Sequence, residues 1–335
     1  MPSHPLDTRR AQPPTHHLRT HHRRLSAGLL ARVTGAFIAA CAAAAVLTPI
    51  TPAAASGAAV SAASSTETRA VDAPTASARS TQSFDPGYII SDENFYDPNT
   101  MTGQQIQAFL RAQTCIPKDA VPCLADYRQT TVSQPGEFAH CAPYVGGRSE
   151  RASAIIATVA TACGISPRVL LVLLQKEQSL VTRPSTYGYQ RATGYACPDT
   201  AVCDAQYFGF FNQVYNAAWQ FREYSASPGW RYHVGRVRVQ FSPNAKCGSA
   251  IVTIRNQATA NLYNYTPYQP NAGTVAAPSA PPTACSTYGN FNFSRIYAQW
   301  FGDPTAHSLP DWWGSCLLFI GGYDCPTDPT AVSVP

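Results

Sequence analysis

The sequence has few charged residues, and those beyond its N-terminal leader are balanced in sign. Charged residues make up 13% of the 335-residue chain, whose formal net charge is +5. Residues 1–57 hold six of the 24 Lys and Arg residues and one of the 19 Asp and Glu residues, which leaves 18 of each sign in the remainder. Since a nucleic-acid-binding protein needs a basic face, we exclude that class and expect no nucleic-acid partner.

Patterns typical of metal sites are also missing. The sequence has no C-x-x-C pair, and five of its eight histidines lie in the leader. Of the other three, only His140 adjoins a cysteine. The usual spacing of zinc ligands is therefore absent, and no cluster of residues indicates a metal or an organic cofactor.

The long apolar stretch lies near the N-terminus. Residues 1–24 are basic, residues 29–50 are mainly Ala, Val, Leu and Ile interrupted by Arg32, and Ala53-Ala54-Ala55 offers a small-residue cleavage site. This pattern predicts a secretory signal peptide over residues 1–57. The apolar run after Arg32 is too short for a membrane span, so we expect a secreted chain without a stable span after cleavage. The export route, general or twin-arginine, stays open.

Cysteine usage is consistent with export. Apart from Cys41 in the leader, ten cysteines remain, and an even number in a secreted chain predicts up to five disulfides of open connectivity. The pairs 115/123, 197/203 and 316/325 are close enough in sequence to close small loops. The disulfide candidates are Cys115, Cys123, Cys141, Cys163, Cys197, Cys203, Cys247, Cys285, Cys316 and Cys325.

Hydrophobic periodicity predicts a mainly α chain of the α+β type, with several helices and one small β-hairpin. We expect a flexible linker over residues 58–83, a helical and loop region over 84–150, a larger domain over 151–304 and a C-terminal tail over 305–335. A helix is predicted to end at Gly164. The expected local features are a capping box from Thr102 to Gln105, a disulfide-bound loop from Cys115 to Cys141, a loop over 182–205, a helix from Tyr207 to Tyr224, a hairpin over 237–254, a helix capped by Asn256 and a last helix from Phe293 to Phe301.

The segment from Ser166 to Val181 has the pattern of a core helix. The Ser166 hydroxyl can cap a backbone N–H, and proline at position 167 lacks the N–H that the first turn leaves unpaired. At about 100° per residue, Glu177 falls in the middle of an apolar stripe, whereas Lys176 lies off it. Apolar surroundings should raise the pKa of this carboxyl, which would suit a general acid. The alternative is a buried glutamate paired with an arginine for structural reasons.

Four features follow one another in the order of a known superfamily. They are Glu177, the segment G-F-F-N-Q at 209–213, the hairpin, and the aromatic, proline-containing segment at 262–271. Over about residues 155–300 the chain resembles the lysozyme-like superfamily, in particular goose-type lysozymes, soluble lytic transglycosylases and bacterial N-acetylglucosaminidases. These families have an apolar helix ending in E-S, then a G-L-M-Q-like segment and an A-Y-N segment. The chain also resembles secreted actinobacterial hemagglutinin-like proteins, which carry K-E-Q-S-L and Y-N-Y-T-P-Y-Q-P-N.

The resemblance implies a disulfide-braced, lysozyme-like helical domain in which Glu177 is the catalytic general acid. It would protonate the glycosidic oxygen between aminosugars of peptidoglycan. In a transglycosylase the same carboxylate would then activate the sugar's own 6-hydroxyl, and in a hydrolase it, or a second carboxylate, would activate water. Asp199 and Asp204 are candidates for that second acid, although aspartates beside cysteines are more often turn formers.

The resemblance also implies a set of sugar-binding residues. Tyrosine rings stack on apolar sugar faces, and amides hydrogen-bond acetamido groups; alternatively, the tyrosines cover the core. Ser179 stands one residue beyond the family's E-S serine. The candidates are Ser179, Gln213, Tyr263, Asn264, Tyr265, Tyr268 and Asn271, with Asn212 as a weaker one.

Two functions remain open at this point. The first is a secreted glycosidase or lytic transglycosylase that cleaves peptidoglycan, or another aminosugar polysaccharide, in the cell envelope of a bacterium. The second is a non-catalytic cell-wall or carbohydrate-binding protein, hemagglutinin-like, on the same scaffold. An inhibitor or a purely structural disulfide-rich protein is less favoured, because neither needs a carboxylate centred on an apolar helix.

Overall fold

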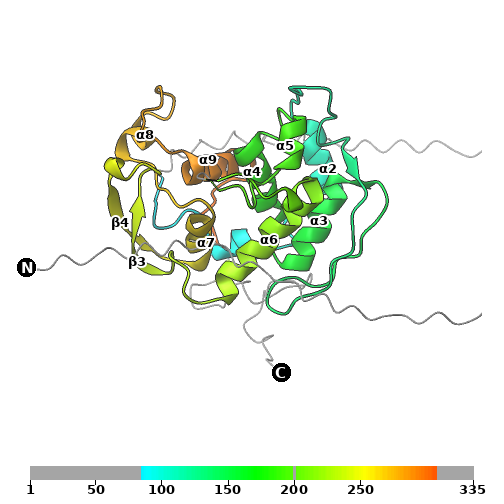
Figure 1. Ribbon diagram of the computed structural model, residues 1–335, viewed down its shortest axis with the longest axis horizontal. Coiled ribbons are helices and arrows are strands. Elements are labelled where there is room, and N and C mark those ends of the chain that lie inside the picture. The colour runs from blue at the N-terminus through cyan, green and yellow to red at the C-terminus, as the bar shows by residue number, and fades with distance from the viewer. Residues whose placement is uncertain (1–83, 199–200, 308–335) are drawn as a thin grey trace, which may run out of the picture. The chain divides into compact units, whose positions relative to one another are not determined.

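The computed structural model describes residues 84–198 and 201–307, and this part of the chain is mainly helical (Figure 1). Two small antiparallel sheets complete it, so the predicted mainly α class with a small hairpin is confirmed. In chain order the elements are α1 (Asp92–Tyr96), α2 (Gly103–Ala112), β1 (Arg128–Gln129), β2 (Glu150–Arg151), α3 (Ala152–Cys163), α4 (Pro167–Gln178), α5 (Thr186–Gln190), the 3₁₀ turn η1 (Ala205–Tyr207), α6 (Phe210–Ala226), β3 (Gly235–Gln240), η2 (Ala245–Cys247), β4 (Ser249–Ile254), α7 (Gln257–Tyr265), α8 (Ala272–Ala276) and α9 (Gly289–Phe301).

The core is built around α4. Every residue from Val169 to Leu174 is fully buried, so this part of the helix is apolar on all sides, as expected for a segment enclosed by other helices. Helices α1, α3 and α9 pack against it, and α6 packs against α3. Figure 1 shows α4 in the middle of the helical part, between α9 and α5. Each fully buried Leu or Val side chain contributes about 1.5–3 kcal/mol of stability.

The start and the end of α4 both differ from the prediction. The Ser166 hydroxyl makes a 2.9 Å hydrogen bond with Oγ1 of Thr100 and does not cap the helix. The helix ends at Gln178, because Ser179 adopts a left-handed conformation with φ of 55°. Leu180 therefore lies outside the helix that was predicted to include it.

Several local predictions are confirmed. Thr102 and Gln105 form a reciprocal capping box at the start of α2. Gly164, with φ of 61°, ends α3. In the hairpin of β3 and β4, Val237 lies opposite Val252 and both are buried, as the alternating pattern indicated.

Other elements were not predicted. The short β1–β2 ladder lies in the region expected to be a disulfide-bound loop and to its C-terminal side, and α5 lies inside the predicted loop over residues 182–205. Helix α6 begins at Phe210, three residues later than predicted, after Gly209 with φ of 103°. Helix α7 extends through Tyr265, which places the first part of the aromatic segment on a helix.

Four disulfides brace the described residues. Cys115–Cys123 and Cys197–Cys203 close the small loops suggested by their spacing. Cys141–Cys163 ties a loop to the end of α3, and Cys247–Cys285 ties η2 to the segment before α9. Cys316, Cys325, the predicted signal peptide and the predicted linker lie outside the described residues.

Two further features concern the predicted organisation of the chain. Buried residues from both predicted segments, 84–150 and 151–304, belong to one hydrophobic cluster, and the boundary between them stays a prediction. Among the described helices, none is both long enough and apolar enough to cross a membrane.

Candidate functional site

The Glu177 carboxyl lies in the last turn of α4 and reaches solvent. Its side chain is 24% exposed, and its Oε1 forms a 2.6 Å salt bridge with Nζ of Lys176. The prediction that apolar side chains surround Glu177 is therefore wrong, because the helix ends before Leu180 and Val181 can complete the apolar stripe on its surface. The alternative, a glutamate in a salt bridge, is closer to what is observed, but its partner is the neighbouring lysine and not an arginine.

The Lys176 side chain is more buried than the carboxylate that it contacts. Its side chain is only 6% exposed, although the helical pattern placed it off the apolar stripe. Besides the salt bridge, Nζ donates a 2.7 Å hydrogen bond to Oγ1 of Thr266, which follows α7. Gly289, at the start of α9, lies against both Thr266 and the Lys176 chain. Thr266 and the start of α9 thus position the lysine that contacts one oxygen of the Glu177 carboxyl.

The other carboxyl oxygen faces the backbone of Gly194. A Cβ atom added to this glycine, whose φ is 72°, would lie 3.4 Å from Oε2 of Glu177. The carbonyl of Thr193 next to it accepts a 2.8 Å hydrogen bond from the hydroxyl of Tyr265. Burial raises the pKa of that hydroxyl well above its usual range, and the nearby Glu177 charge adds to the rise. The structure thus brings together two of the predicted site residues, Glu177 and Tyr265.

Gln213 positions the chain that carries Gly194. Its side chain is fully buried at the start of α6. Its Oε1 accepts hydrogen bonds from the backbone N–H groups of Thr193 and Tyr195 and from the Thr193 hydroxyl. Its Nε2 donates to the carbonyls of Tyr195 and Tyr207. Because this amide is enclosed and fully engaged, it holds the loop beside Glu177 and does not face a ligand.

Two more of the predicted sugar-binding residues face inward. Tyr263 is fully buried, and its hydroxyl donates a 3.0 Å hydrogen bond to the carbonyl of Pro86. Asn264 accepts from the N–H of Tyr232 and donates to its carbonyl, which fastens α7 to the segment before β3. These positions favour the alternative interpretation, in which the residues cover and join parts of the core.

The remaining predicted residues lie in turns or at helix ends. Ser179 forms the left-handed end of α4, and half-buried Tyr268 forms a backbone bridge with Gln240. Asp204 is exposed and caps η1, where its two oxygens accept hydrogen bonds from the backbone and the side chain of Gln206. Asp199 lies outside the described residues.

The side chains of Asn212 and Asn271 also have structural contacts. Asn212 donates a 3.0 Å hydrogen bond to the carbonyl of Phe208. Asn271 caps α8 through the N–H of Thr274, and its amide donates to the carbonyl of Cys285. Among the predicted sugar-binding residues, Tyr265 is the one whose hydroxyl lies near enough to Glu177 for the carboxylate charge to raise its pKa.

The sequence carried little signal for Lys176 and Gly194. Neighbours in sequence do not share a face of a helix, so Lys176 was not expected to contact the Glu177 carboxyl. The two side chains meet because both extend past the last turn of α4 toward Thr266 and the Gly194 loop. Gly194 is one of 21 glycines, and nothing local indicates that its loop closes over this helix end.

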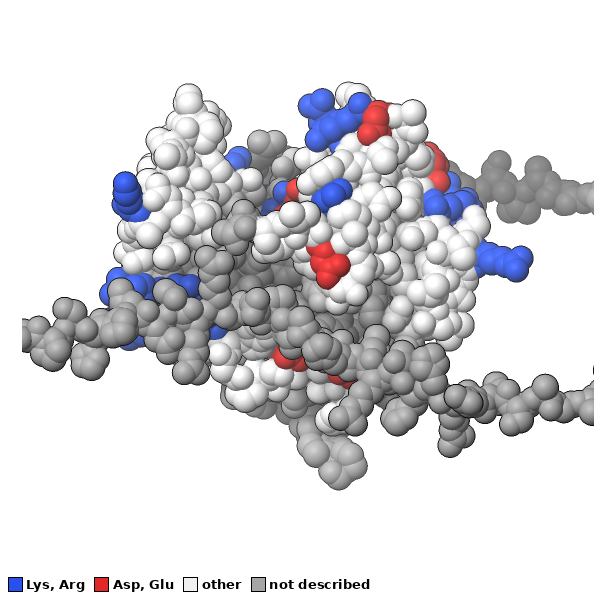
Figure 2. Space-filling view, in the orientation of Figure 1, with Lys and Arg blue, Asp and Glu red and all other residues white. Residues whose placement is uncertain are grey.

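The face of the molecule shown in Figure 2 is notched between its hairpin side, with β3, β4 and α8, and its helical side, with α2 and α5. Helix α4 lies between these two sides in Figure 1.

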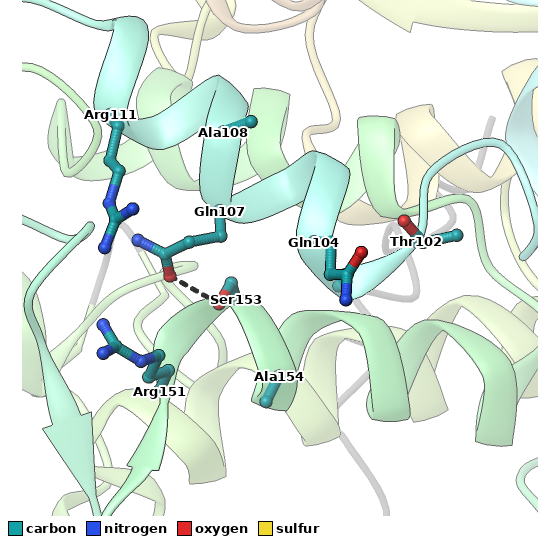
Figure 3. A pocket seen from close by; sticks show the side chains of 9 residues that line it. Thr102, Gln104, Gln107, Ala108, Arg111, Arg151, Ser153 and Ala154 are labelled. Carbon is teal, nitrogen blue, oxygen red and sulfur yellow. Dashed lines mark hydrogen bonds between the residues drawn. The ribbon is translucent and has the colours of Figure 1, made fainter. Parts of the chain in front are cut away.

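A separate groove, with a volume of about 740 Å³, lies between α2 and the start of α3 (Figure 3). None of the residues around Glu177 lines that groove. Among the described residues, no group of three or more His, Cys, Asp or Glu side chains is arranged to hold a metal ion.

Comparison with known proteins identifies a family. The family model described as "LasA, N-terminal domain" matches residues 88–312, about two thirds of the chain, and this span includes the whole Glu177 site. Searches of curated proteins and of solved structures found no match, and no finding supports the lysozyme-like resemblance. Together with the disulfides, the family indicates an extracellular, cell-wall-related protein. The chain belongs to the LasA N-terminal domain family.

Proposed function

We propose that this protein is secreted to the bacterial cell envelope and cleaves the glycan strand of peptidoglycan, with Glu177 as a single general acid and base. The observation that carries the proposal is the placement of the Glu177 carboxyl. Lys176 fixes Oε1, while Oε2 faces the Gly194 backbone at a partly exposed position. A carboxyl group held in one orientation, with one oxygen left to a ligand, is what proton transfer to a glycosidic oxygen requires.

Two local features of this helix end are unfavourable for stability. A carboxylate in the last turn faces the negative end of the helix dipole, which costs about 0.3–1 kcal/mol. Ser179 is left-handed with φ of 55°, a conformation that costs a residue with a Cβ about 1–2 kcal/mol and that glycine would adopt freely. Unfavourable conformations of this kind cluster at functional sites, and here two of them adjoin the same carboxyl group.

The arrangement favours a mechanism with one carboxylate. Within the described residues, no second acidic side chain bonds to Glu177, Lys176 or Thr193, and Asp204 is engaged in its own turn. Ordinary glycosidases need two carboxyl groups at set separations. One is sufficient where the sugar's own 6-hydroxyl attacks, because the group that protonates the leaving oxygen can deprotonate that hydroxyl. We therefore favour transglycosylation over hydrolysis.

A second candidate is a non-catalytic glycan-binding protein. The 2.6 Å salt bridge between Lys176 and Glu177 favours it, because an ion pair satisfies the carboxylate without a substrate. The buried positions of Tyr263 and Gln213 also favour it, because they leave fewer side chains to position a sugar for reaction.

Product analysis of digested peptidoglycan separates these functions. The purified chain is incubated with insoluble peptidoglycan, and soluble fragments are identified by mass spectrometry. Anhydro-sugar ends would establish transglycosylation, and reducing ends would establish hydrolysis. If the chain sediments with the polymer and releases no fragments, it is a binding protein and the catalytic proposal is wrong.

Gly194→Ala should reduce glycan release at least about tenfold, because its methyl group would lie in van der Waals contact with Oε2 of Glu177 and cover the oxygen that the ligand needs. A left-handed glycine also loses about 1–2 kcal/mol of stability when replaced by alanine. Gly229→Ala is the matched control, since Gly229 has φ of 95° and open space around the added Cβ. Both variants should therefore show similar losses in thermal unfolding. Equal glycan release by the two would contradict the placement of Oε2 as the working oxygen.

A further inference from the structure

The groove between α2 and α3 is independent of the Glu177 site. Its lining includes three small residues, Gly103, Ala108 and Ala154, and Figure 3 shows the two helices that border it. Its volume of about 740 Å³ falls within the range of sites that bind small ligands. The lining contains no acidic residue.

Two arginines extend into this groove from different elements. Arg111 comes from the last turn of α2 and Arg151 from β2, and in Figure 3 both guanidinium groups point to the space beside Gln107 and Ser153. In the described part of the chain, neither arginine has a salt bridge. Arg128 lies directly opposite Arg151 in the β1–β2 ladder, an arrangement of like charges that is unfavourable.

The floor of the groove is fixed by hydrogen bonds. Oε1 of Gln107 accepts a 2.7 Å hydrogen bond from the hydroxyl of Ser153, and its Nε2 donates to the carbonyl of Ala125 at 2.9 Å. Gln104 is exposed on the same helix and offers its amide at the rim. The groove therefore combines two cations, an amide and a rigid floor bordered by small side chains.

We propose that this groove binds an extended peptide with a free carboxylate, and that Arg111 and Arg151 hold the carboxylate. Guanidinium groups match carboxylates with paired hydrogen bonds. The Gln104 amide pairs with the peptide backbone, and the small lining residues accommodate small aliphatic side chains. An anion at this point also offsets the repulsion between Arg128 and Arg151. The site does not depend on glycan cleavage at Glu177.

A titration of the isotopically labelled full chain, followed by NMR chemical shifts, tests the ligand class. The probes are acetyl-trialanine with a free carboxylate, the same peptide as its C-terminal amide, and inorganic phosphate. The free acid should shift the backbone amides of residues 103–111 and 151–154 and bind about tenfold more tightly than the amide, because a charged hydrogen-bonded pair is lost in the amide. Phosphate binding as tight as that of the free acid, or shifts centred on Gly194, would overturn the proposal.

Charge-matched variants test the two arginines. Arg111→Gln and Arg151→Gln should each weaken binding of the free acid about tenfold, and Arg151→Lys should restore only part of the loss because an ammonium lacks the paired donors. Arg148→Gln is the control, since Arg148 is exposed on the loop before β2 and does not line the groove. If Arg148→Gln weakens binding equally, the effect is one of net charge and the site is refuted. Unaltered thermal unfolding confirms that each variant is folded.

Discussion

Glu177→Gln should abolish glycan cleavage while leaving the protein folded. Removing a general acid and base lowers the rate by about 10²–10⁴-fold, and among the described residues no other acidic side chain bonds to Lys176 or Thr193. The glutamine keeps a carbonyl oxygen that can accept from Nζ of Lys176, whose side chain is 6% exposed. We therefore expect a stability loss of only about 1–2 kcal/mol. Fragment release measured by mass spectrometry, with thermal unfolding in parallel, checks both expectations.

Glu137→Gln is the matched control for this substitution. Glu137 also accepts a side-chain hydrogen bond, from Nε1 of Trp219 at 2.8 Å, and also faces a cationic partner, His140 at 3.7 Å when protonated. It is 54% exposed and lies outside the proposed site. The control should digest peptidoglycan at the rate of the unmodified chain. Cleavage by Glu177→Gln at that same rate would remove the single-carboxylate mechanism, whatever the products are.

Gln213→Leu should produce the largest loss of stability of any single substitution considered. The leucine leaves the N–H groups of Thr193 and Tyr195 and the carbonyls of Tyr195 and Tyr207 without their buried partner. Each unsatisfied group costs about 1–3 kcal/mol, and some of these groups will recover water as the loop relaxes. We expect a net loss of about 3–5 kcal/mol, measured by denaturant unfolding.

A second consequence of Gln213→Leu distinguishes positioning from simple folding stability. At a low temperature where the variant stays folded, the loop of Thr193 and Gly194 should still shift, and glycan release should fall with it. Gln206→Leu is the control, because its amide makes one exposed side-chain contact, to Asp204, and should change stability by about 0.5 kcal/mol or less. If the two leucine variants unfold at the same denaturant concentration, Gln213 does not hold the loop.

The parts of the fold that the sequence predicted are those set by neighbouring residues. The capping box needs only Thr102 and Gln105, three positions apart, and the end of α3 needs only a glycine that can become left-handed. The hairpin follows from alternation, since one face of two short strands must be buried. The disulfides at 115–123 and 197–203 close loops so short that proximity in the chain indicated the pairing.

The interior of the site could not be predicted in this way. Gln213 and Tyr263 were expected to face sugar, because an amide or a phenol has the same chemistry whether it meets a ligand or the backbone. Whether such a side chain contacts a ligand or the backbone depends on chain segments far away in sequence. Thr193 is the partner of Gln213, and Pro86 is the partner of Tyr263. The pairing of Cys141 with Cys163 likewise depends on how a loop returns to the end of α3.

The sequence by itself determined the helical class, the hairpin and the disulfide-rich secreted character, since composition and short-range spacing are enough for these, and it also led to the proposal of Glu177 as the catalytic residue. Tertiary structure alone decided where α4 ends, and therefore that the Glu177 carboxyl meets Lys176 and Gly194 and not a ring of leucines. The physical reason is that periodicity describes a helix as if it continued. No glycine or proline at Ser179 indicates the left-handed turn in the sequence. The turn forms as the segments around this helix end pack together.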